Sequence, residues 1–588
     1  SISQLSDAVG WEGFEAKTVV ENNVSIGYCH HPQRMPKAGI YIDDNIIVLA
    51  DIRIYNLEEL HQKFDFNLPE EALAKAFLKW GTDCGNYING DYAAAIYDRN
   101  NRQLFLLRDH IGTRPLVYCR SGSTVFFASH EFGLAKSGLY HTALSEKKLI
   151  DTFFQLKRIY AQTDFKSIKK VIPGHGITFS ENAVAIHKYW KPELIKKNNS
   201  LTFGSAVQNL REKIIFATIN RMEQVNTGLH VSGGIDSCGI ASIVADHTSD
   251  HSRLIGYSWT PEVFEDTADG VNEKEFIEAF STDKKVGVKY QNLDEYETVK
   301  NSILPEFSIT HIEHPIMQTA EQDQIEVMFS GWGGDEFVSL SMRGIVNHLF
   351  FKLKWKTLLE YCKVRGIKTT LYQLRTDVIP FLIPFGLMPV YKAQRTDLSV
   401  LTLFKPLFIK KHLRQILSHK KSKVFGYGDR NKFVLNLLNL HHLPERMESW
   451  AINAERYGFE YKYPLLDKDA LEFWFSIPVK FTYQNFESRL LYRDAMKGIL
   501  TEKIRIRKDK GEAVRIAFSD REKQNGRSYL ENLFYSLPPQ NHLPYFNIKA
   551  LKKVFSQPYK KGSLKSIKNV NKCTFYLRYV ELVKNYRE

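Results

Sequence analysis

The residues most suited to chemistry lie in the stretch 229–237, which reads Leu-His-Val-Ser-Gly-Gly-Ile-Asp-Ser. A short apolar run ends at Gly233 and Gly234, and apolar positions with helical spacing follow from Ile240 to Ala245. This order predicts a strand, a tight turn and a helix. The two glycines allow a ligand to approach the backbone, and the N–H groups at the helix start favour a phosphate-type anion.

Asp236 is the unusual member of this loop, because a carboxylate repels phosphate unless a cation lies between them. We therefore expect a magnesium ion at Asp236. The Gly-Lys-Ser/Thr string of the Walker pattern is missing here. For the loop alone, an ordinary glycine turn is the alternative. The predicted nucleotide-binding residues of this loop are Val231, Ser232, Gly233, Gly234, Asp236 and Ser237.

A second cluster, residues 327–336, reads Val-Met-Phe-Ser-Gly-Trp-Gly-Gly-Asp-Glu. An apolar run again ends in glycines and carboxylates. Alternating strands and helices between the two clusters predict a parallel sheet, in which the carboxyl ends of the strands meet at one edge. We expect Asp335 to share the magnesium ion with Asp236, and Ser330 and Gly331 to contact the nucleotide.

The first loop resembles the pyrophosphate-binding loop of N-type ATP pyrophosphatases, and the second resembles the Ser/Thr-Gly-x-Gly-x-Asp-Glu loop of the asparagine synthetase family. The resemblance implies that ATP and Mg²⁺ are cofactors and that a substrate is adenylated while pyrophosphate leaves. It also implies that Trp259, which follows the predicted strand 254–258, lines the adenine pocket. Packing of Trp259 in the core is an equal alternative.

At the middle position of the second loop, asparagine synthetases have Glu and β-lactam synthetases have Tyr, whereas this chain has Trp332. An indole only donates a hydrogen bond. We expect Trp332 to contact the substrate, as a wall or stacking surface for the acyl-adenylate.

Two later strings also resemble the family. Glu460 holds the glutamate position of Gly-x-Glu-x-Arg-x-Pro, and we expect it to take the amine's proton; an ion pair with Lys462 is the alternative. In the string Arg-Lys-Asp-Lys-Gly, residues 507–511, we expect Lys510 rather than Lys508 to stabilise charge on the acyl group and pyrophosphate. A solvated basic turn is the alternative there.

Short alternating segments between residues 40 and 135 predict a β-rich domain. Three strings, at residues 51–56, 108–116 and 127–131, resemble the Ntn-type glutaminase domain of asparagine synthetases. Where that domain is active, a cysteine attacks glutamine and an Asn-Gly pair forms the oxyanion hole, but here Asp51 replaces Asn. Losing one such donor costs about 3–4 kcal/mol. The resemblance therefore points to the glutaminase-inactive branch, which includes β-lactam synthetases and lasso-peptide cyclases.

The composition fits a two-domain globular protein of 588 residues with a formal net charge of +14. The basic residues look dispersed apart from a run at residues 410–423, so we expect phosphate-bearing or acidic ligands rather than nucleic acid. Six scattered cysteines and no secretory signal predict a cytoplasmic protein. The most apolar stretch, residues 378–390, is too short to span a membrane and contains three prolines.

The predicted fold is α/β and α+β. Residues 1–195 form a degenerate glutaminase-like, β-rich sandwich, and residues 203–588 form an ATP-pyrophosphatase domain with a doubly wound parallel sheet and a helical extension. We expect an ATP-dependent amide synthetase that closes a macrolactam, with a lasso-peptide cyclase as first choice. The alternatives are a β-lactam synthetase-like cyclase, a glutamine-dependent asparagine synthetase and a non-enzymatic scaffold. The expected partners are a peptide or small amino-acid-like substrate and, for a peptide, a leader-peptide protease.

Overall fold

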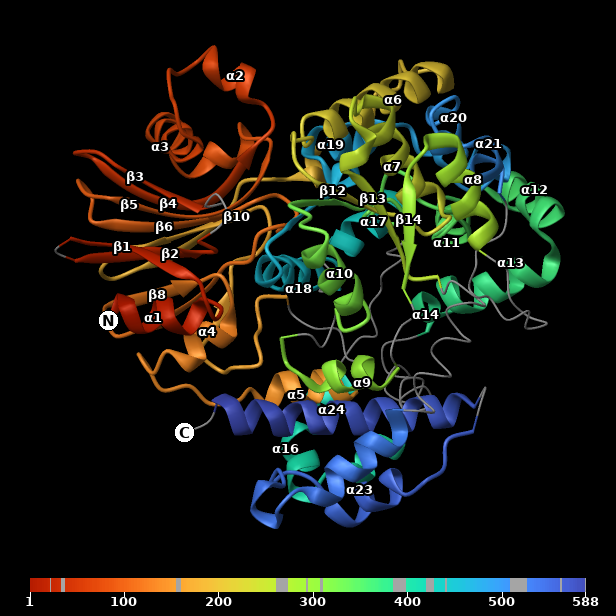
Figure 1. The fold of residues 1–588 in the computed structure, drawn as a ribbon. Coiled ribbons are helices and arrows are strands. Elements are labelled where there is room, and N and C mark those ends of the chain that lie inside the picture. The colour runs from red at the N-terminus through yellow and green to blue at the C-terminus, as the bar shows by residue number, and fades with distance from the viewer. Residues whose placement is uncertain are drawn as a thin grey trace.

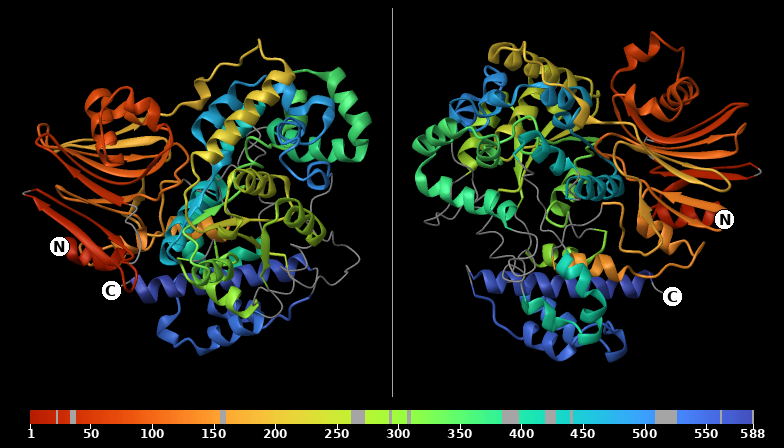
Figure 2. Two further views of the ribbon diagram at one scale, coloured as in Figure 1. Left: turned by 45° about the horizontal axis from the view of Figure 1, so that its top comes forward. Right: turned by 180° about the vertical axis from the view of Figure 1, so that it is seen from behind.

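The computed structural model describes residues 1–21, 23–32, 38–154, 160–260, 273–291, 295–306, 310–383, 398–418, 428–438, 442–507, 526–560 and 563–586. Two sheet-containing parts lie side by side, and a layer of helices lies beneath them (Figure 1). No helix in these ranges is long and apolar enough to cross a bilayer. Figure 2 shows the same arrangement from two further directions.

The N-terminal part is β-rich, as predicted. Its large sheet is antiparallel and has the order β11 (Val184–Lys188), β10 (His175–Phe179), β6 (Gln103–Arg108), β5 (Gly90–Asp98), β4 (Ile46–Ile54) and β3 (Ala38–Ile42). Below it lie the hairpin of β1 (Glu15–Glu21) with β2 (Val24–His30) and the small sheet of β8 (Thr124–Ala128), β7 (Val117–Ser121) and β9 (Lys169–Lys170) (Figure 1). Around the strands lie the helices α1 (Ile2–Val9), α2 (Leu57–His61), α3 (Pro69–Trp80) and α4 (Glu131–Lys136), whereas α5 (Glu146–Phe153) lies lower, against α24 (Leu564–Tyr586) (Figure 1).

The second part contains the predicted parallel sheet, in the order β14 (Gly287–Tyr290), β13 (Leu254–Ser258), β12 (Thr227–His230), β15 (Val327–Phe329) and β16 (Glu460–Lys462). In Figure 1, α6 (Phe203–Ile219) and α7 (Ile235–His247) lie above this sheet, and α10 (His314–Gln322) and α18 (His442–Arg456) lie below it. The strand order reverses at β12, because β13 pairs on one side of it and β15 on the other. Ligands of doubly wound sheets bind at such a switch point.

The remaining helices complete the second part. They are α8 (Lys274–Lys284), α9 (Glu295–Ile303), α11 (Ile345–Phe351), α12 (Trp355–Arg365), α13 (Ile367–Gln373), α14 (Ile379–Leu382), α17 (Arg430–Leu438), α19 (Lys468–Ser476), α20 (Leu490–Ala495) and α21 (Glu502–Arg505). The described residues between 343 and 442 are thus mainly helical.

We use the name helical extension for the described residues 398–418, 526–560 and 563–586, which form the lowest layer in Figure 1. It contains α16 (Pro406–Ser418), α23 (Ile548–Phe555) and α24 (Leu564–Tyr586). Its buried side chains, such as Phe404 and Tyr576, share one hydrophobic core with Phe132 of α4 and Phe153 of α5. The end of the chain is therefore packed against the N-terminal part.

Candidate active site

The first loop begins where β12 ends. The N–H of Val231 still donates to the carbonyl of Tyr257 at 2.9 Å, and Gly233 then turns the chain with a φ of +66°. Gly234 precedes α7 and provides no side-chain cap. The first N–H groups of α7 therefore receive no bond from a capping side chain, and they present positive partial charge to an anion. The predicted strand, turn and helix are confirmed.

Two hydroxyls close the other side of this turn. The Oγ atoms of Ser232 and Ser237 lie 2.7 Å apart, and the Ser237 Oγ also accepts a bond from the Ser232 N–H at 3.3 Å. Both side chains are half-buried. The loop therefore combines backbone N–H groups with two hydroxyls, which are the donors that phosphate oxygens require.

The second loop lies directly against the first. A Cβ at residue 331 would come within 2.4 Å of the Asp236 carbonyl carbon, and a Cβ at residue 334 within 2.5 Å of the Asp236 carboxylate. Only glycine fits at such contacts. Ser330, which is buried, continues the sheet by donating its N–H to the carbonyl of Lys462 at 3.0 Å. The two predicted loops thus meet at the switch point of the sheet.

Arg489 lies between the two predicted metal ligands. Its Nη1 donates to Asp236 Oδ2 at 2.8 Å, and its Nη2 pairs with the carboxylate of Asp335. The two carboxylates are therefore no further apart than one guanidinium can bridge. Sequence reasoning missed Arg489, since no spacing rule joins residue 489 to the two loops. The requirement for a cation beside these carboxylates was the only signal that pointed to a positive charge here.

A magnesium ion would fit the donors present. Carboxylate oxygens from Asp236 and Asp335 are the ligands that magnesium prefers, and magnesium usually takes only one or two carboxylates together with phosphate oxygens and water. Within the described residues no group of three or more His, Cys, Asp or Glu side chains could hold a metal ion alone. A metal at this place would therefore depend on the nucleotide for further ligands.

Trp259 follows β13 and is half-buried at the same edge of the sheet. Its ring lies 4.6 Å from that of His230, in a T-shaped arrangement. Burial lowers the pKa of His230 to about 3, so its ring is neutral at physiological pH. The ring contact is equally compatible with an adenine pocket and with core packing, so the adenine contact of Trp259 stays a prediction.

Trp332 belongs to an aromatic group below the second loop. Its ring packs edge-on against that of Trp450 on α18 at 5.2 Å, and the guanidinium of Arg446 lies 4.8 Å from its ring centroid. The indole Nε1 is buried and has no hydrogen-bond partner within the described part of the chain. An unmade bond of this kind costs about 1–3 kcal/mol. A ligand acceptor at Nε1 would recover that cost.

Glu460 lies on β16 and is buried among cations. Its Oε2 accepts from Arg114 Nη2 at 2.7 Å, Arg53 Nη2 lies 3.4 Å away, and Lys462 pairs with its other oxygen. Burial acts to lower the pKa of Arg114, but Asp51 and Glu460 raise it well above its ordinary value. The ion pair with Lys462 is therefore present and extends into the N-terminal part. Proton transfer by Glu460 stays a prediction.

Lys510 lies outside the described residues, which end before it at Arg507. Arg507 is buried against the first loop, where its Nη1 donates to the Gly233 carbonyl at 3.0 Å and its guanidinium lies 4.1 Å from the Phe276 ring centroid. Arg507 therefore lies beside the first loop.

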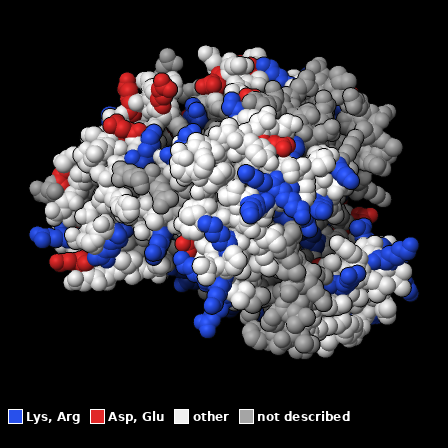
Figure 3. Space-filling view, turned by 90° about the horizontal axis from the view of Figure 1, so that it is seen from below, with Lys and Arg blue, Asp and Glu red and all other residues white. Residues whose placement is uncertain are grey.

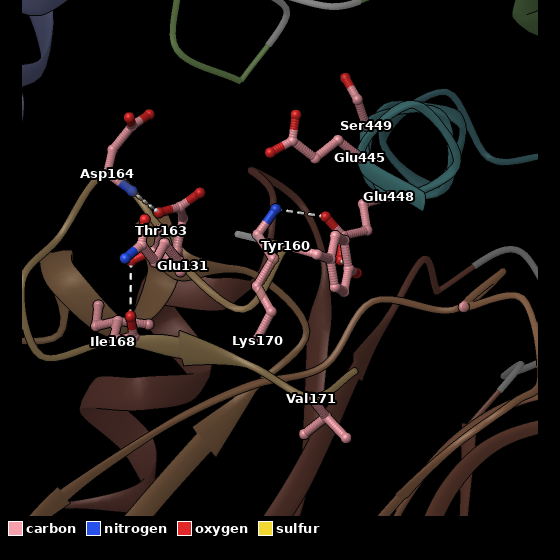
Figure 4. Close-up of polar contacts among 12 residues, drawn as sticks. Glu131, Tyr160, Thr163, Asp164, Ile168, Lys170, Val171, Glu445, Glu448 and Ser449 are labelled. Atoms are coloured by element: carbon pink, nitrogen blue, oxygen red, sulfur yellow. Dashed lines mark hydrogen bonds and ion pairs between the residues drawn. The ribbon is translucent and has the colours of Figure 1, made fainter. Parts of the chain in front are cut away.

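A buried polar network joins α18 to the N-terminal part (Figure 4). Glu448 accepts from Arg108 Nη1 at 2.8 Å and from Lys170 Nζ at 2.5 Å. Burial acts to raise the pKa of Glu448, but the two cations outweigh it and hold that pKa below its ordinary value. The network borders a cavity of about 460 Å³. There Glu131 accepts from the N–H of Asp164 at 2.7 Å, and burial raises the pKa of Glu131 to about 7.

The N-terminal part contains its own cavity of about 420 Å³, between the layers of strands. Asp51 and Cys29 both line it. The Asp51 carboxylate lies 3.7 Å from Arg114 Nε. Burial, together with Asp7, raises the pKa of the Cys29 thiol, which is the opposite of what a nucleophilic cysteine needs.

Comparison with known proteins divides the chain in the same way. The glutamine amidotransferase domain matches residues 40–190, and asparagine synthase matches residues 209–361 and 442–572. The chain is 29% identical to asparagine synthetase [glutamine-hydrolyzing] 3 of Bacillus subtilis (strain 168), over 42% of this chain and 44% of that protein. It is 26% identical to amidase chyE of Penicillium rubens, over 36% of this chain and 32% of that protein.

Among solved structures, glutamine phosphoribosylpyrophosphate amidotransferase from B. subtilis, complexed with ADP and GMP, aligns with a TM-score of 0.21 and 13% identity. That alignment covers 38% of this chain and 49% of the other. The chain spans less than half the length of the two relatives named above. Two matched domains in the predicted order, together with the two glycine loops, support one conclusion. The chain belongs to the asparagine synthetase family, whose members are ATP-dependent ligases that form C–N bonds.

Proposed function

We propose that this protein is an ATP- and magnesium-dependent amide synthetase. It adenylates a substrate carboxylate with release of pyrophosphate, and an amine of the same substrate then attacks the acyl carbon, forming the amide bond and releasing AMP. The observation that carries this proposal is the contact between the two glycine loops at the sheet's switch point, where the uncapped start of α7 lies beside two carboxylates. Magnesium at Asp236 and Asp335 would neutralise charge on the phosphate oxygens.

The protein's own groups have separate tasks in this proposal. Ser232, Ser237 and the N–H groups after Gly234 bind the pyrophosphate, and Trp259 and Ser330 contact the nucleoside. Because an amine of the same substrate reaches a high effective concentration, positioning supplies much of the rate. Glu460 accepts the amine's proton and Lys510 stabilises the reacting acyl group.

We infer that the substrate is a peptide closed into a macrolactam, as by a lasso-peptide cyclase. Support comes from Trp332, whose buried N–H lacks a partner within the described residues, and from the N-terminal cavity. That cavity holds the carboxylate of Asp51 and a thiol with a raised pKa, a poor setting for glutamine hydrolysis. On this proposal residues 1–195 are a degenerate domain, residues 203–588 are the synthetase, and a cytoplasmic leader-peptide protease supplies the substrate.

The test is ATP–pyrophosphate exchange with candidate precursor peptides. We expect exchange with a core peptide and its loss in Asp236→Asn, while the matched control Asp246→Asn, on the exposed end of the same helix, keeps wild-type exchange. Absence of exchange with peptides and with small β-amino acids alike would leave a scaffold role instead.

A glutamine-dependent asparagine synthetase is the second candidate, since one relative is named as glutamine-hydrolyzing. Release of glutamate from glutamine by the full chain, abolished by a cysteine alkylator, would favour that function. It would also contradict our proposal that the N-terminal domain does not hydrolyse glutamine.

A further inference from the structure

The helical extension has a net positive charge close to that of the whole chain. Its described residues contain fourteen lysines and arginines but only two carboxylates, Glu531 and Glu581, which gives a net charge of +12. The whole chain has +14. The basic residues themselves are dispersed, as expected, since the other 66 of the 80 lie elsewhere in the chain. The extension differs in having almost no carboxylates, so that segments far apart in sequence fold into one unit of net positive charge.

Most of this charge faces solvent. Eleven of the fourteen cations are exposed, whereas neither carboxylate is. Lys411 pairs with Glu146 at 2.5 Å, and Lys584 lies 3.9 Å from Glu581. The other nine exposed cations have no carboxylate partner within the described part of the chain. Figure 3, seen from below, shows Lys and Arg side chains outnumbering Asp and Glu on this face.

The helices bury apolar side chains inward and turn lysines outward. In α23, Leu551 and Phe555 are buried, whereas Lys549, Lys552 and Lys553 are exposed. The extension lies in the lowest layer of Figure 1, apart from the loops that meet at the switch point of the parallel sheet. Phosphate binding at the first loop therefore does not account for this charge.

Exposed leucines lie among the cations. Leu407 on α16 is 82% exposed and Leu413 is 43% exposed, next to exposed Lys410 and Arg414. Phe408, the next residue along the helix, is instead buried in the core. A nucleic acid or an acidic peptide would use the cations but would leave the leucines in water. The surface of an anionic bilayer accepts both, because leucines enter the acyl boundary while lysines contact head groups.

We propose that the helical extension docks the protein on an anionic lipid surface through α16 and α23. The partner is a bilayer that contains acidic phospholipid, and no segment needs to span it. The inference does not depend on the proposed synthetase activity. Each Lys or Arg near such a surface contributes about 1 kcal/mol, or about fivefold in partitioning, and salt weakens the attraction.

The experiment is sedimentation of the full-length protein with vesicles of phosphatidylcholine alone or mixed with phosphatidylglycerol. We expect binding only to the mixed vesicles, and weaker binding as salt rises. The triple variant Lys549→Glu, Lys552→Glu and Lys553→Glu should lose roughly 100-fold or more in partitioning. The matched control reverses three exposed lysines elsewhere, Lys17, Lys191 and Lys196, and should bind as wild type does.

The variant Leu407→Ser distinguishes a lipid surface from RNA or an acidic peptide as the partner. On the lipid proposal it weakens vesicle binding several-fold, because one buried leucine is lost, whereas binding to RNA or to polyglutamate would not change. Equal binding to both vesicle types, loss of binding in the control triple variant, or tight binding to RNA or polyglutamate without vesicle binding would each overturn the proposal. Circular dichroism of each variant confirms that it is folded before binding is compared.

Discussion

Replacing Gly331 by alanine tests the contact between the two loops. The added Cβ would lie 2.4 Å from both the Asp236 carbonyl carbon and the Ser237 amide nitrogen, and 2.6 Å from the Asp236 carbonyl oxygen. Carbon atoms pack at about 3.5–4.0 Å, so the loops must separate by about 1 Å. Because the obstructing atoms belong to the backbone at the start of α7, no side-chain rotation can relieve the clash.

Two magnitudes follow from this displacement. Overpacking of this kind costs about 1–3 kcal/mol of folding free energy, and a 1 Å misplacement of positioning groups costs about 100-fold in rate. We therefore expect Gly331→Ala to remain folded but to lose about two orders of magnitude in adenylation rate, with weaker binding of MgATP. Titration with MgATP, thermal unfolding and pyrophosphate exchange measure the three effects.

Gly287→Ala is the matched control, since its Cβ would meet no atom within 4 Å and its φ is ordinary. It lies on β14 of the same sheet and should behave as wild type. Gly334→Ala is an independent probe, because its Cβ would approach the Asp236 carboxylate at 2.5 Å. If both loop variants bind MgATP and exchange pyrophosphate as wild type does, the two loops do not form one site and the reasoning fails.

Three further predictions concern charge. Arg489→Gln leaves two close carboxylates without their bridging guanidinium, so the variant should melt lower than wild type and gain more stability from added Mg²⁺ in a thermal melt. Glu448→Gln leaves the buried cations of Arg108 and Lys170 without their carboxylate, so the free energy of unfolding in urea should fall by about 3–5 kcal/mol. An unchanged urea midpoint would contradict the network in Figure 4. Burial lowers the pKa of His230 from 6.5 to about 3 in the folded protein, so between these pH values only the unfolded chain binds a proton at this residue. The free energy of unfolding should therefore fall by about 1.4 kcal/mol for each pH unit as the pH drops from 6.5 to about 3. His230→Leu should remove this pH dependence from denaturant unfolding curves.

The sequence was sufficient for the two loops because each carries a local signal. Glycines mark positions where a Cβ does not fit, as at Gly331, and helical spacing marks α7. The parallel sheet followed from the alternation of strands and helices. These features depend on residues that are neighbours in the chain.

The long-range ion pairs could not be predicted in the same way. Arg489 meets Asp236 across 253 residues, and Arg114 meets Glu460 across 346. No periodicity or spacing rule reports such pairs, since they depend on how whole domains pack. The net positive charge of the helical extension escaped sequence reasoning for the same reason, because α16 and α24 are more than 100 residues apart in the chain.

The N-terminal part supplies charges that the second part requires. Arg108, Arg114 and Lys170 all bind buried carboxylates of α18 or β16. A buried carboxylate that loses its cation is strongly destabilised, whereas replacing both partners by apolar groups is not. These pairs therefore make the two parts dependent on each other whether or not the first hydrolyses glutamine. If its chemistry is lost, as we propose, the domain is still needed for stability, because its cations pair with the buried carboxylates of Glu460 and Glu448.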